Sequence, residues 1–139
     1  MPFLRRRRTS VTAPEPADTR AVIARGWNDL PWGTSIAEFE ARFPHASGEA
    51  GGWWTTGTGT EEFCGTEMDA RYAFNSRGEL YLVAFYPGAR DRERLAVAVM
   101  NELGAPDGMS TRWTIGEVEV DVKVAGTVAT LTHRRLATQ

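Results

Sequence analysis

The residues best suited to chemistry lie in one short segment, GGWWTTGTGTEEFCG, at residues 51–65. The segment combines glycines and threonines with two carboxylates, Glu61 and Glu62, and with Cys64, the only cysteine of the chain. Residues of these types can cradle a phosphate, act as a nucleophile, or transfer protons as an acid–base pair. Each of these functions requires further residues elsewhere in the chain.

The glycine-rich part lacks the partners of a phosphate-binding loop. Such a loop needs a lysine that contacts the phosphates and a helix that begins directly after it. Here Gly57-Thr58-Gly59 is followed by two glutamates and by strand-like sequence, and the glutamates would repel a phosphate. We therefore expect a β-hairpin instead, with strands at residues 53–56 and 61–65 and a flexible tip at residues 57–60.

The cysteine and the histidines do not form a recognisable catalytic or metal-binding pattern. A nucleophilic thiolate needs a base or a positive field beside it. The chain contains two histidines, His45 and His133, and nothing in the sequence places either of them near Cys64. Their wide spacing also matches no metal-ligand motif. We expect no catalytic residue, no metal and no cofactor, and we regard an enzyme as the less favoured class.

The carboxylates of this region are expected to be solvated. Adjacent strand residues point to opposite faces, so Glu61 and Glu62 would not share one site. Glu67 and Asp69 could share a face, but no polar partner motif accompanies them. The pattern is typical of exposed strand residues.

The aromatic residues are the more suggestive feature, because the chain contains five tryptophans. Trp53 and Trp54 are consecutive, so in a strand one of them faces inward and the other outward. Aromatic residues and arginine are enriched at protein-binding hot spots. The sequence therefore predicts a partner-binding surface formed by Trp53, Trp54, Arg71, Tyr81 and Phe85.

Charge divides the chain into a basic arm and an acidic body. Residues 1–20 carry a net charge of +3, and because the whole chain carries −2, the other 119 residues carry −5. An acidic body repels nucleic-acid backbones, which argues against a nucleic-acid reader. We expect residues 1–20 to be a disordered arm and linker, able at most to make weak contacts with anions through Arg5, Arg6, Arg7 and Arg8.

The remaining 119 residues, 21–139, are expected to form a single domain in the cytoplasm. No apolar run is long enough to span a membrane. No apolar segment follows the N-terminal arginines, so a secretory signal is not indicated. The single cysteine cannot form a disulfide within the chain, which fits a reducing compartment.

Local patterns predict the elements of that domain. Ser35 and Glu38 form a capping box that begins a helix over residues 35–43, and Pro44 ends it. A hairpin follows at residues 71–86, where Asn75-Ser76-Arg77-Gly78 is the turn. A second helix is expected over residues 91–103, with Asp91 as its cap and Gly104 at its end.

The clearest pattern is the strict alternation of valines with charged residues at 118–124. It predicts the middle strand of a three-stranded meander over residues 111–134, with one face in the core and the other in water. Short turns require antiparallel pairing. The expected fold is α+β: a single twisted antiparallel sheet, built from two hairpins, a helix and the meander, with two helices packed on one face.

These segments resemble a pattern found in small uncharacterised bacterial α+β proteins. The resemblance covers residues 27–133 and rests on PWGTSIAEFEARFPHA, YAFNSRGELYLVAFYP, a helix that ends in LGAP, and TRWTIGEVEVDV. It implies a shared fold and transfers no catalytic residues. The layout of helices and meander is more loosely similar to that of β-lactamase inhibitory proteins.

Two functions are consistent with these observations. The first is a non-enzymatic protein-interaction module of the inhibitor, immunity or accessory-subunit type, which binds its partner through an aromatic sheet face or a hairpin. The alternative is a domain that binds a small molecule or a lipid, or a weak enzyme, with a pocket between the helices and the sheet. A homodimer formed through sheet edges or an apolar face is compatible with the first.

Overall fold

The structure, a computed structural model, describes residues 16–49 and 51–139. The predicted contacts of Arg5 to Arg8 with anions lie outside the described residues. The helices are α2 (Pro16–Arg25), α3 (Ile36–Arg42), α4 (Arg92–Leu103) and α5 (Arg134–Ala137), with the short 3-10 helices η2 (Ala89–Asp91) and η3 (Val124–Gly126). The strands are β1 (Gly26–Trp27), β2 (Leu30–Pro31), β3 (Ser47–Gly48), β4 (Trp54–Thr55), β5 (Glu61–Phe63), β6 (Thr66–Phe74), β7 (Leu80–Tyr86), β8 (Arg112–Ile115), β9 (Val118–Val122) and β10 (Ala129–His133).

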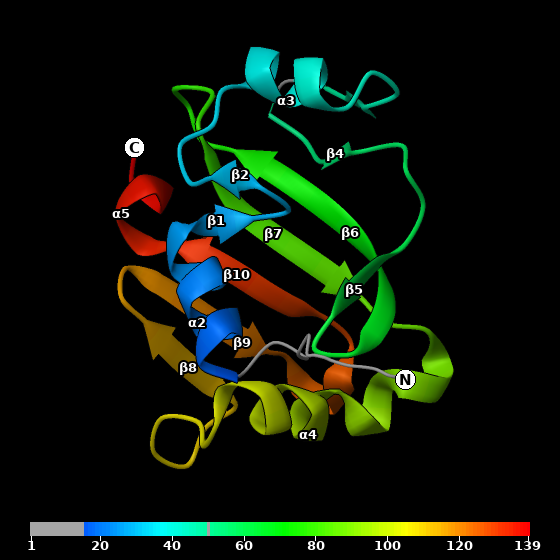
Figure 1. Cartoon of the computed structure of the whole chain (residues 1–139), viewed down its shortest axis with the longest axis vertical. Coiled ribbons are helices and arrows are strands. Elements are labelled where there is room, and N and C mark those ends of the chain that lie inside the picture. The colour runs from blue at the N-terminus through cyan, green and yellow to red at the C-terminus, as the bar shows by residue number, and fades with distance from the viewer. Residues whose placement is uncertain (1–15, 50) are drawn as a thin grey trace, which may run out of the picture.

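An antiparallel, twisted sheet forms the centre of the molecule (Figure 1). Its strands follow the order β3-β4-β6-β7-β10-β9-β8, and β5 pairs with the first part of β6. β1 and β2 make a separate hairpin in front of the sheet. This arrangement confirms the predicted α+β fold with a twisted antiparallel sheet.

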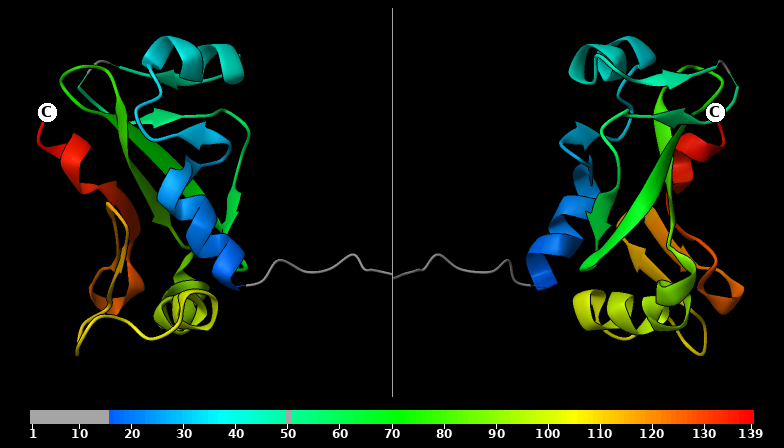
Figure 2. Two further views of the ribbon diagram at one scale, coloured as in Figure 1. Left: turned by 60° about the vertical axis from the view of Figure 1, so that its left-hand side comes forward. Right: turned by 90° about the vertical axis from the view of Figure 1, so that its right-hand side faces the viewer.

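The helices α2, α3 and α4 lie on the same side of the sheet, together with the β1–β2 hairpin (Figure 2). Phe39 of α3 packs its ring against Tyr72 at 5.2 Å and against Phe74 at 5.4 Å between ring centroids. On α4, Leu95 and Val99 are buried, as their helical spacing predicts. Both predicted helices therefore cover one face, and α2 and the hairpin add to that layer.

The helix ends follow the local signals with one exception. Ser35 and Glu38 form the full capping box of α3. Gly104 ends α4 with a φ of 91°, which glycine adopts without strain. Asp91 makes no capping hydrogen bond to α4, and its carboxylate instead pairs with Arg94 at 2.9 Å. The prediction of a capping Asp91 is therefore wrong, because η2 continues directly into α4 and gives Asp91 a helical backbone (φ −96°, ψ −6°) instead of the extended one of a capping residue.

The C-terminal meander is confirmed, and its last strand joins it to the rest of the sheet. Val118, Val120 and Val122 are buried, whereas Glu119 and Asp121 between them are partly exposed. β10 lies between β9 and β7. The meander therefore attaches to the sheet through the strand that comes last in sequence.

The predicted hairpin between residues 53–56 and 61–65 is wrong. β4 pairs with β3 and with β6, while β5 pairs with β6 alone. The turn that reverses the chain is Cys64-Gly65, where both residues have positive φ, 52° and 80°. Two such residues favour a tight two-residue hairpin turn, and residues 57–60 only connect two strands that both lie against β6.

A β-bulge changes the expected faces of β7. Leu82 pairs with Ala73 and Leu80 pairs with Phe74, so Tyr81 is the extra residue. The bulge turns Leu80 to the same face as Val83, and both side chains are fully buried. Simple alternation would place Leu80 on the face of Leu82 and Ala84, so it fails at this one position.

The boundary of the N-terminal arm at residue 20 also needs correction. α2 begins at Pro16, and the Arg20 guanidinium donates a hydrogen bond to the backbone oxygen of Leu103 at 2.8 Å. Ile23 of the same helix is fully buried. Its backbone oxygen accepts a hydrogen bond from the indole of Trp32 at 2.8 Å. Residues 16–20 thus begin a helix that continues into the folded body.

Candidate functional site

The β1–β2 hairpin places two polar side chains beside the sheet. Its two-residue turn consists of Asn28 and Asp29, with φ of 54° and 61°. Asn and Asp are the non-glycine residues that best tolerate this left-handed conformation, and it matches the twist of a tight hairpin. The turn holds the Trp27 ring edge-on against Phe63 and Phe85, with ring centroids 5.4 Å and 5.2 Å away.

A hydrogen-bond network connects this hairpin to β5 and β6. Glu61 Oε1 accepts a hydrogen bond from the hydroxyl of Tyr72 at 2.7 Å and another from Trp27 Nε1 at 3.2 Å. The side-chain amide of Asn28 donates to the Tyr72 hydroxyl oxygen at 3.2 Å. The Tyr72 hydroxyl therefore both accepts and donates, and it orients the carboxylate of Glu61.

Strand alternation explains why Glu61 is drawn inward. Glu61 and Phe63 are two residues apart on β5, so they share a face, and Phe63 is fully buried. Glu61 also lies opposite Met68 of β6, another buried residue. The carboxylate therefore sits at the margin of the core, only partly exposed.

This position perturbs both ionisable groups of the network. Burial raises the pKa of Glu61, the hydrogen bonds from Tyr72 and Trp27 oppose that shift, and the charge of Asp69 adds to it. Burial, together with the nearby Glu61, raises the pKa of Tyr72 well above its usual range. Tyr72 is therefore a neutral hydrogen-bond donor, and Glu61 is the group that can change its charge.

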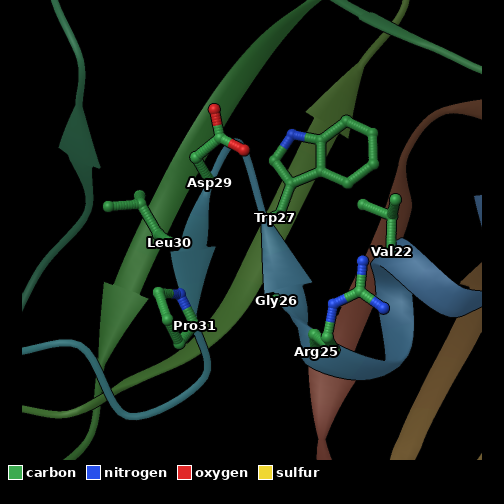
Figure 3. A pocket seen from close by; sticks show the side chains of 7 residues that line it. All are labelled: Val22, Arg25, Gly26, Trp27, Asp29, Leu30 and Pro31. Carbon is green, nitrogen blue, oxygen red and sulfur yellow. The ribbon is translucent and has the colours of Figure 1, made fainter.

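Glu61 lines an open cleft of about 540 Å³. We call it the Glu61 cleft, and its walls are Val22 of α2, Trp27, Asn28 and Asp29 of the hairpin, Arg42 and Phe43 at the end of α3, and Thr58, Glu61 and Glu62. A second hollow of about 470 Å³ adjoins it and shares Val22, Trp27 and Asp29 (Figure 3). The hairpin thus separates two hollows with Trp27 between them.

Arg42, the basic residue that lines the cleft, already forms an ion pair with Asp29. The Arg42 guanidinium lies 3.5 Å from the Asp29 carboxylate and 5.1 Å from the centre of the Phe43 ring. Both partners of the ion pair are largely exposed, so it contributes little to stability. Its effect is to neutralise Asp29 at the rim of the cleft.

The five residues predicted to bind a partner do not form one surface. Trp54 and Phe85 are buried and Phe85 has no exposed area, so this part of the prediction is corrected. Phe85 stacks on Phe63 with ring centroids 4.4 Å apart. Trp53 is 44% exposed, which answers which of the two tryptophans faces outward.

Arg71 and Tyr81 are both partly exposed. Arg71 pairs with Asp69 at 2.8 Å on the face of the sheet away from the core. Tyr81 occupies the bulge of β7. Partner binding by the accessible residues Trp53, Arg71 and Tyr81 stays a prediction.

The other candidates for chemistry are placed apart from one another. Burial and the charge of Glu102 raise the pKa of Cys64 to about 12, which keeps its thiol protonated. His133 is buried, and its Nδ1 accepts a hydrogen bond from the backbone N–H of Leu136 at 3.3 Å. His45 is exposed. Within the described residues, no group of three potential ligands could hold a metal ion, and no helix is long and apolar enough to cross a membrane.

Comparisons of the chain with models of protein families, with curated proteins and with solved structures find no match. The arguments about function therefore rest on the geometry of the site.

Sequence reasoning missed Trp27, Asn28 and Tyr72 and assigned Glu61 to the solvent. One signal for Glu61 was available, because its spacing of two from Phe63 predicts a shared inward face. The dipeptide Asn28-Asp29 was a second signal, since such pairs favour tight turns. No local signal joins the hairpin to Tyr72, which lies 44 residues after Asn28 in the chain.

The raised pKa of Glu61 predicts a pH-dependent gain in stability when its charge is removed. The pKa of Glu61 in the folded protein lies above its usual value of 4.5, so folding favours the protonated carboxyl. The contribution of Glu61 to the free energy of unfolding is therefore fully present below about pH 4.5 and is lost as the pH rises through the folded pKa. Glu61→Gln should therefore raise the melting temperature by a few degrees at about pH 8 and leave it nearly unchanged at about pH 4. Thermal unfolding followed by circular dichroism measures this difference.

Glu62→Gln is the matched control, because Glu62 is the next residue and is exposed. It should change the melting temperature little at either pH. A Glu61→Gln variant that is less stable than the wild type at about pH 8 would contradict the predicted linkage.

Proposed function

We propose that the protein is a binding module for a small organic ligand, which it holds in the Glu61 cleft. The observation that carries the proposal is the half-buried carboxylate of Glu61, oriented by Tyr72 and Trp27 at the wall of this cleft. This is the second of the two functions considered from the sequence, a ligand pocket between helices and sheet.

The composition of the cleft supports ligand binding. Its volume of about 540 Å³ lies within the range of small-molecule sites, roughly 300–1,000 Å³. Its walls combine apolar surface from Val22, Trp27 and Phe43 with a few polar groups that converge from separate elements. A few placed polar groups in an apolar hollow are the usual arrangement of a specific ligand site.

A purely structural role would not require a carboxylate at position 61. Partial burial of an ionisable group opposes folding unless its hydrogen bonds compensate for the lost water. An apolar residue at this position would pack beside Phe63 and Met68 without that penalty. Perturbed acids in clefts gather at functional sites, and this favours a role for Glu61 toward a ligand.

The test is to fill the cleft without disturbing the network. Glu62 is exposed and lines the cleft, so Glu62→Trp should occupy its mouth and leave the fold intact. A fragment library is titrated into the wild type and the variant by NMR, with the indole N–H signal of Trp27 as the reporter. We expect fragments that shift this signal in the wild type and lose at least about tenfold in affinity, or 1.4 kcal/mol, in Glu62→Trp.

Glu40→Trp is the control for adding a tryptophan, because Glu40 is exposed on α3 and does not line the cleft. It should retain the affinity of the wild type. The proposal fails if no fragment shifts the Trp27 signal, or if Glu62→Trp binds every fragment as the wild type does.

Binding of a second copy through the sheet face away from the core is a second candidate. Exposed Trp53 and Tyr86 favour it, and so do charges of both signs on that face, among them Arg112 and Asp121. Sedimentation at two protein concentrations tests it. A dimer that Trp53→Ala dissociates would support this candidate, and a monomer at both concentrations would exclude it.

A further inference from the structure

We infer that the ligand of the Glu61 cleft carries an organic cation, such as a primary ammonium group, attached to a small apolar body. This inference rests on the proposed function and names the chemical class that the site recognises. It follows from the hydrogen bonds of Glu61, from the aromatic walls and from the charge of the lining residues.

The two oxygens of Glu61 are used unequally. Among the described residues, both donors bind Oε1, and Oε2 receives no hydrogen bond. A carboxylate oxygen has two lone pairs, so Oε2, with no donor in the part of the chain that the structure describes, is free to accept hydrogen bonds from a ligand. A ligand ammonium group provides three N–H donors and a compensating positive charge for Oε2.

The walls beside Glu61 suit the body of such a ligand. Trp27, Phe43 and Val22 contribute aromatic and aliphatic surface to the cleft. Aromatic faces attract cations as well as apolar groups, and the Arg42 guanidinium already lies over the Phe43 ring. A ring or short alkyl chain attached to the cation can therefore pack on this apolar surface while the ammonium group pairs with Glu61.

The charge of the cleft selects against anions. Its lining contains the carboxylates of Asp29, Glu61 and Glu62 and one guanidinium, that of Arg42, which pairs with Asp29. Asp69 of β6 also raises the pKa of Glu61, but it pairs with Arg71 on the other face of the sheet and does not line the cleft. An anionic ligand would meet two unpaired carboxylates, whereas a cation would compensate the charge that is partly removed from water.

A consequence of this chemistry is that binding and proton release are linked. Glu61 must be ionised to pair with an ammonium group, and a cation beside it favours the ionised form. Affinity for a cation should therefore decrease as the pH falls toward the range in which Glu61 takes up a proton. A neutral ligand of the same shape should show no such decrease.

The experiment compares three probes of similar shape, benzylamine, benzyl alcohol and benzoate, by NMR titration of the Trp27 indole signal. At about pH 8 we expect benzylamine to bind at least about tenfold more tightly than benzyl alcohol, and benzoate to bind most weakly. Lowering the pH to about 5 should reduce this preference. Glu61→Gln should abolish it, and Glu40→Gln, an exposed position outside the cleft, should keep it.

The outcomes separate this inference from the proposed function. If benzyl alcohol or benzoate binds as tightly as benzylamine, or if Glu61→Gln keeps the preference, the cationic class is wrong although the cleft still binds ligands. Neutral or anionic fragments that bind in the cleft without any cationic one overturn it as well. If Glu61→Gln does not fold, the pH series on the wild type decides alone, and a preference that is independent of pH overturns the inference.

Discussion

Replacing Phe85 with alanine is expected to lower the free energy of unfolding by about 3–5 kcal/mol. Phe85 has no exposed area, and its ring stacks on Phe63 and lies edge-on to Trp27. Alanine would remove the ring and leave a cavity at the junction of β7, β5 and the β1–β2 hairpin. Because paired strands and the rings of Phe63 and Trp27 hold the walls of this cavity in place, the structure can close it only in part.

Tyr86→Ala provides the matched control. Tyr86 is the next residue of β7, its ring faces the other side of the sheet, and it is 39% exposed. Its removal should cost less than about 1 kcal/mol, as is usual for exposed side chains. Chemical denaturation measures both variants. A Phe85→Ala variant that is no less stable than Tyr86→Ala would show that Phe85 is not part of the core.

The Phe85→Ala variant should also weaken the ligand site. Phe85 supports the Trp27 ring, and Trp27 donates one of the two hydrogen bonds to Glu61. Loss of that support should broaden the Trp27 indole signal in NMR spectra. The role of Phe85 would then be to hold the Trp27 ring in position for its hydrogen bond to Glu61, and not to contact a partner as predicted from the sequence.

Replacing Gly126 with alanine is expected to destabilise the protein by about 2–5 kcal/mol, from backbone strain and overpacking together. Gly126 has a φ of 65°, and it is buried where η3 meets the first turn of α4. A Cβ atom at this position would overlap the backbone oxygen of Arg92 and lie 2.8 Å from its carbonyl carbon. Backbone atoms cannot rotate away as a side chain can, so η3 and α4 would have to separate.

Gly116→Ala isolates the conformational part of this effect. Gly116 has a φ of 59°, close to that of Gly126, but a Cβ atom there would meet nothing within 4 Å. Its substitution should cost about 1–2 kcal/mol, the penalty for the left-handed conformation alone. The prediction is wrong if the two variants have the same midpoint of denaturation.

Several elements could be predicted from residues that are near each other in sequence. The capping box of α3 lies within four residues, and the turn at residues 75–78 joins two strands that pair directly. The alternation of Val118, Val120 and Val122 needs no knowledge of the partner strands, because a strand with one wet face has period two. These signals act over short distances, and the tertiary contacts agree with them.

Other features could not be predicted, because they arise where distant segments meet. Both β4 and β5 pair with β6, and this choice depends on which of the available strands pair most stably. The bulge at Tyr81 sets the register of β7, which pairs with β6 on one side and with β10 on the other. The hydrogen bond from Trp27 to Glu61 joins residues 34 positions apart. No local pattern encodes such a pairing.

The segment at residues 51–65 shows the division between sequence and structure most clearly. Its residue types determined what chemistry was possible there and excluded a phosphate loop, because glutamates follow the glycines. Only the tertiary structure decided which residue has a role. It turned Glu61 inward beside Phe63 and brought Trp27 and Tyr72 to the same carboxylate oxygen. The physical reason is that burial sets the environment of an acid, and burial depends on which elements pack together across the whole chain.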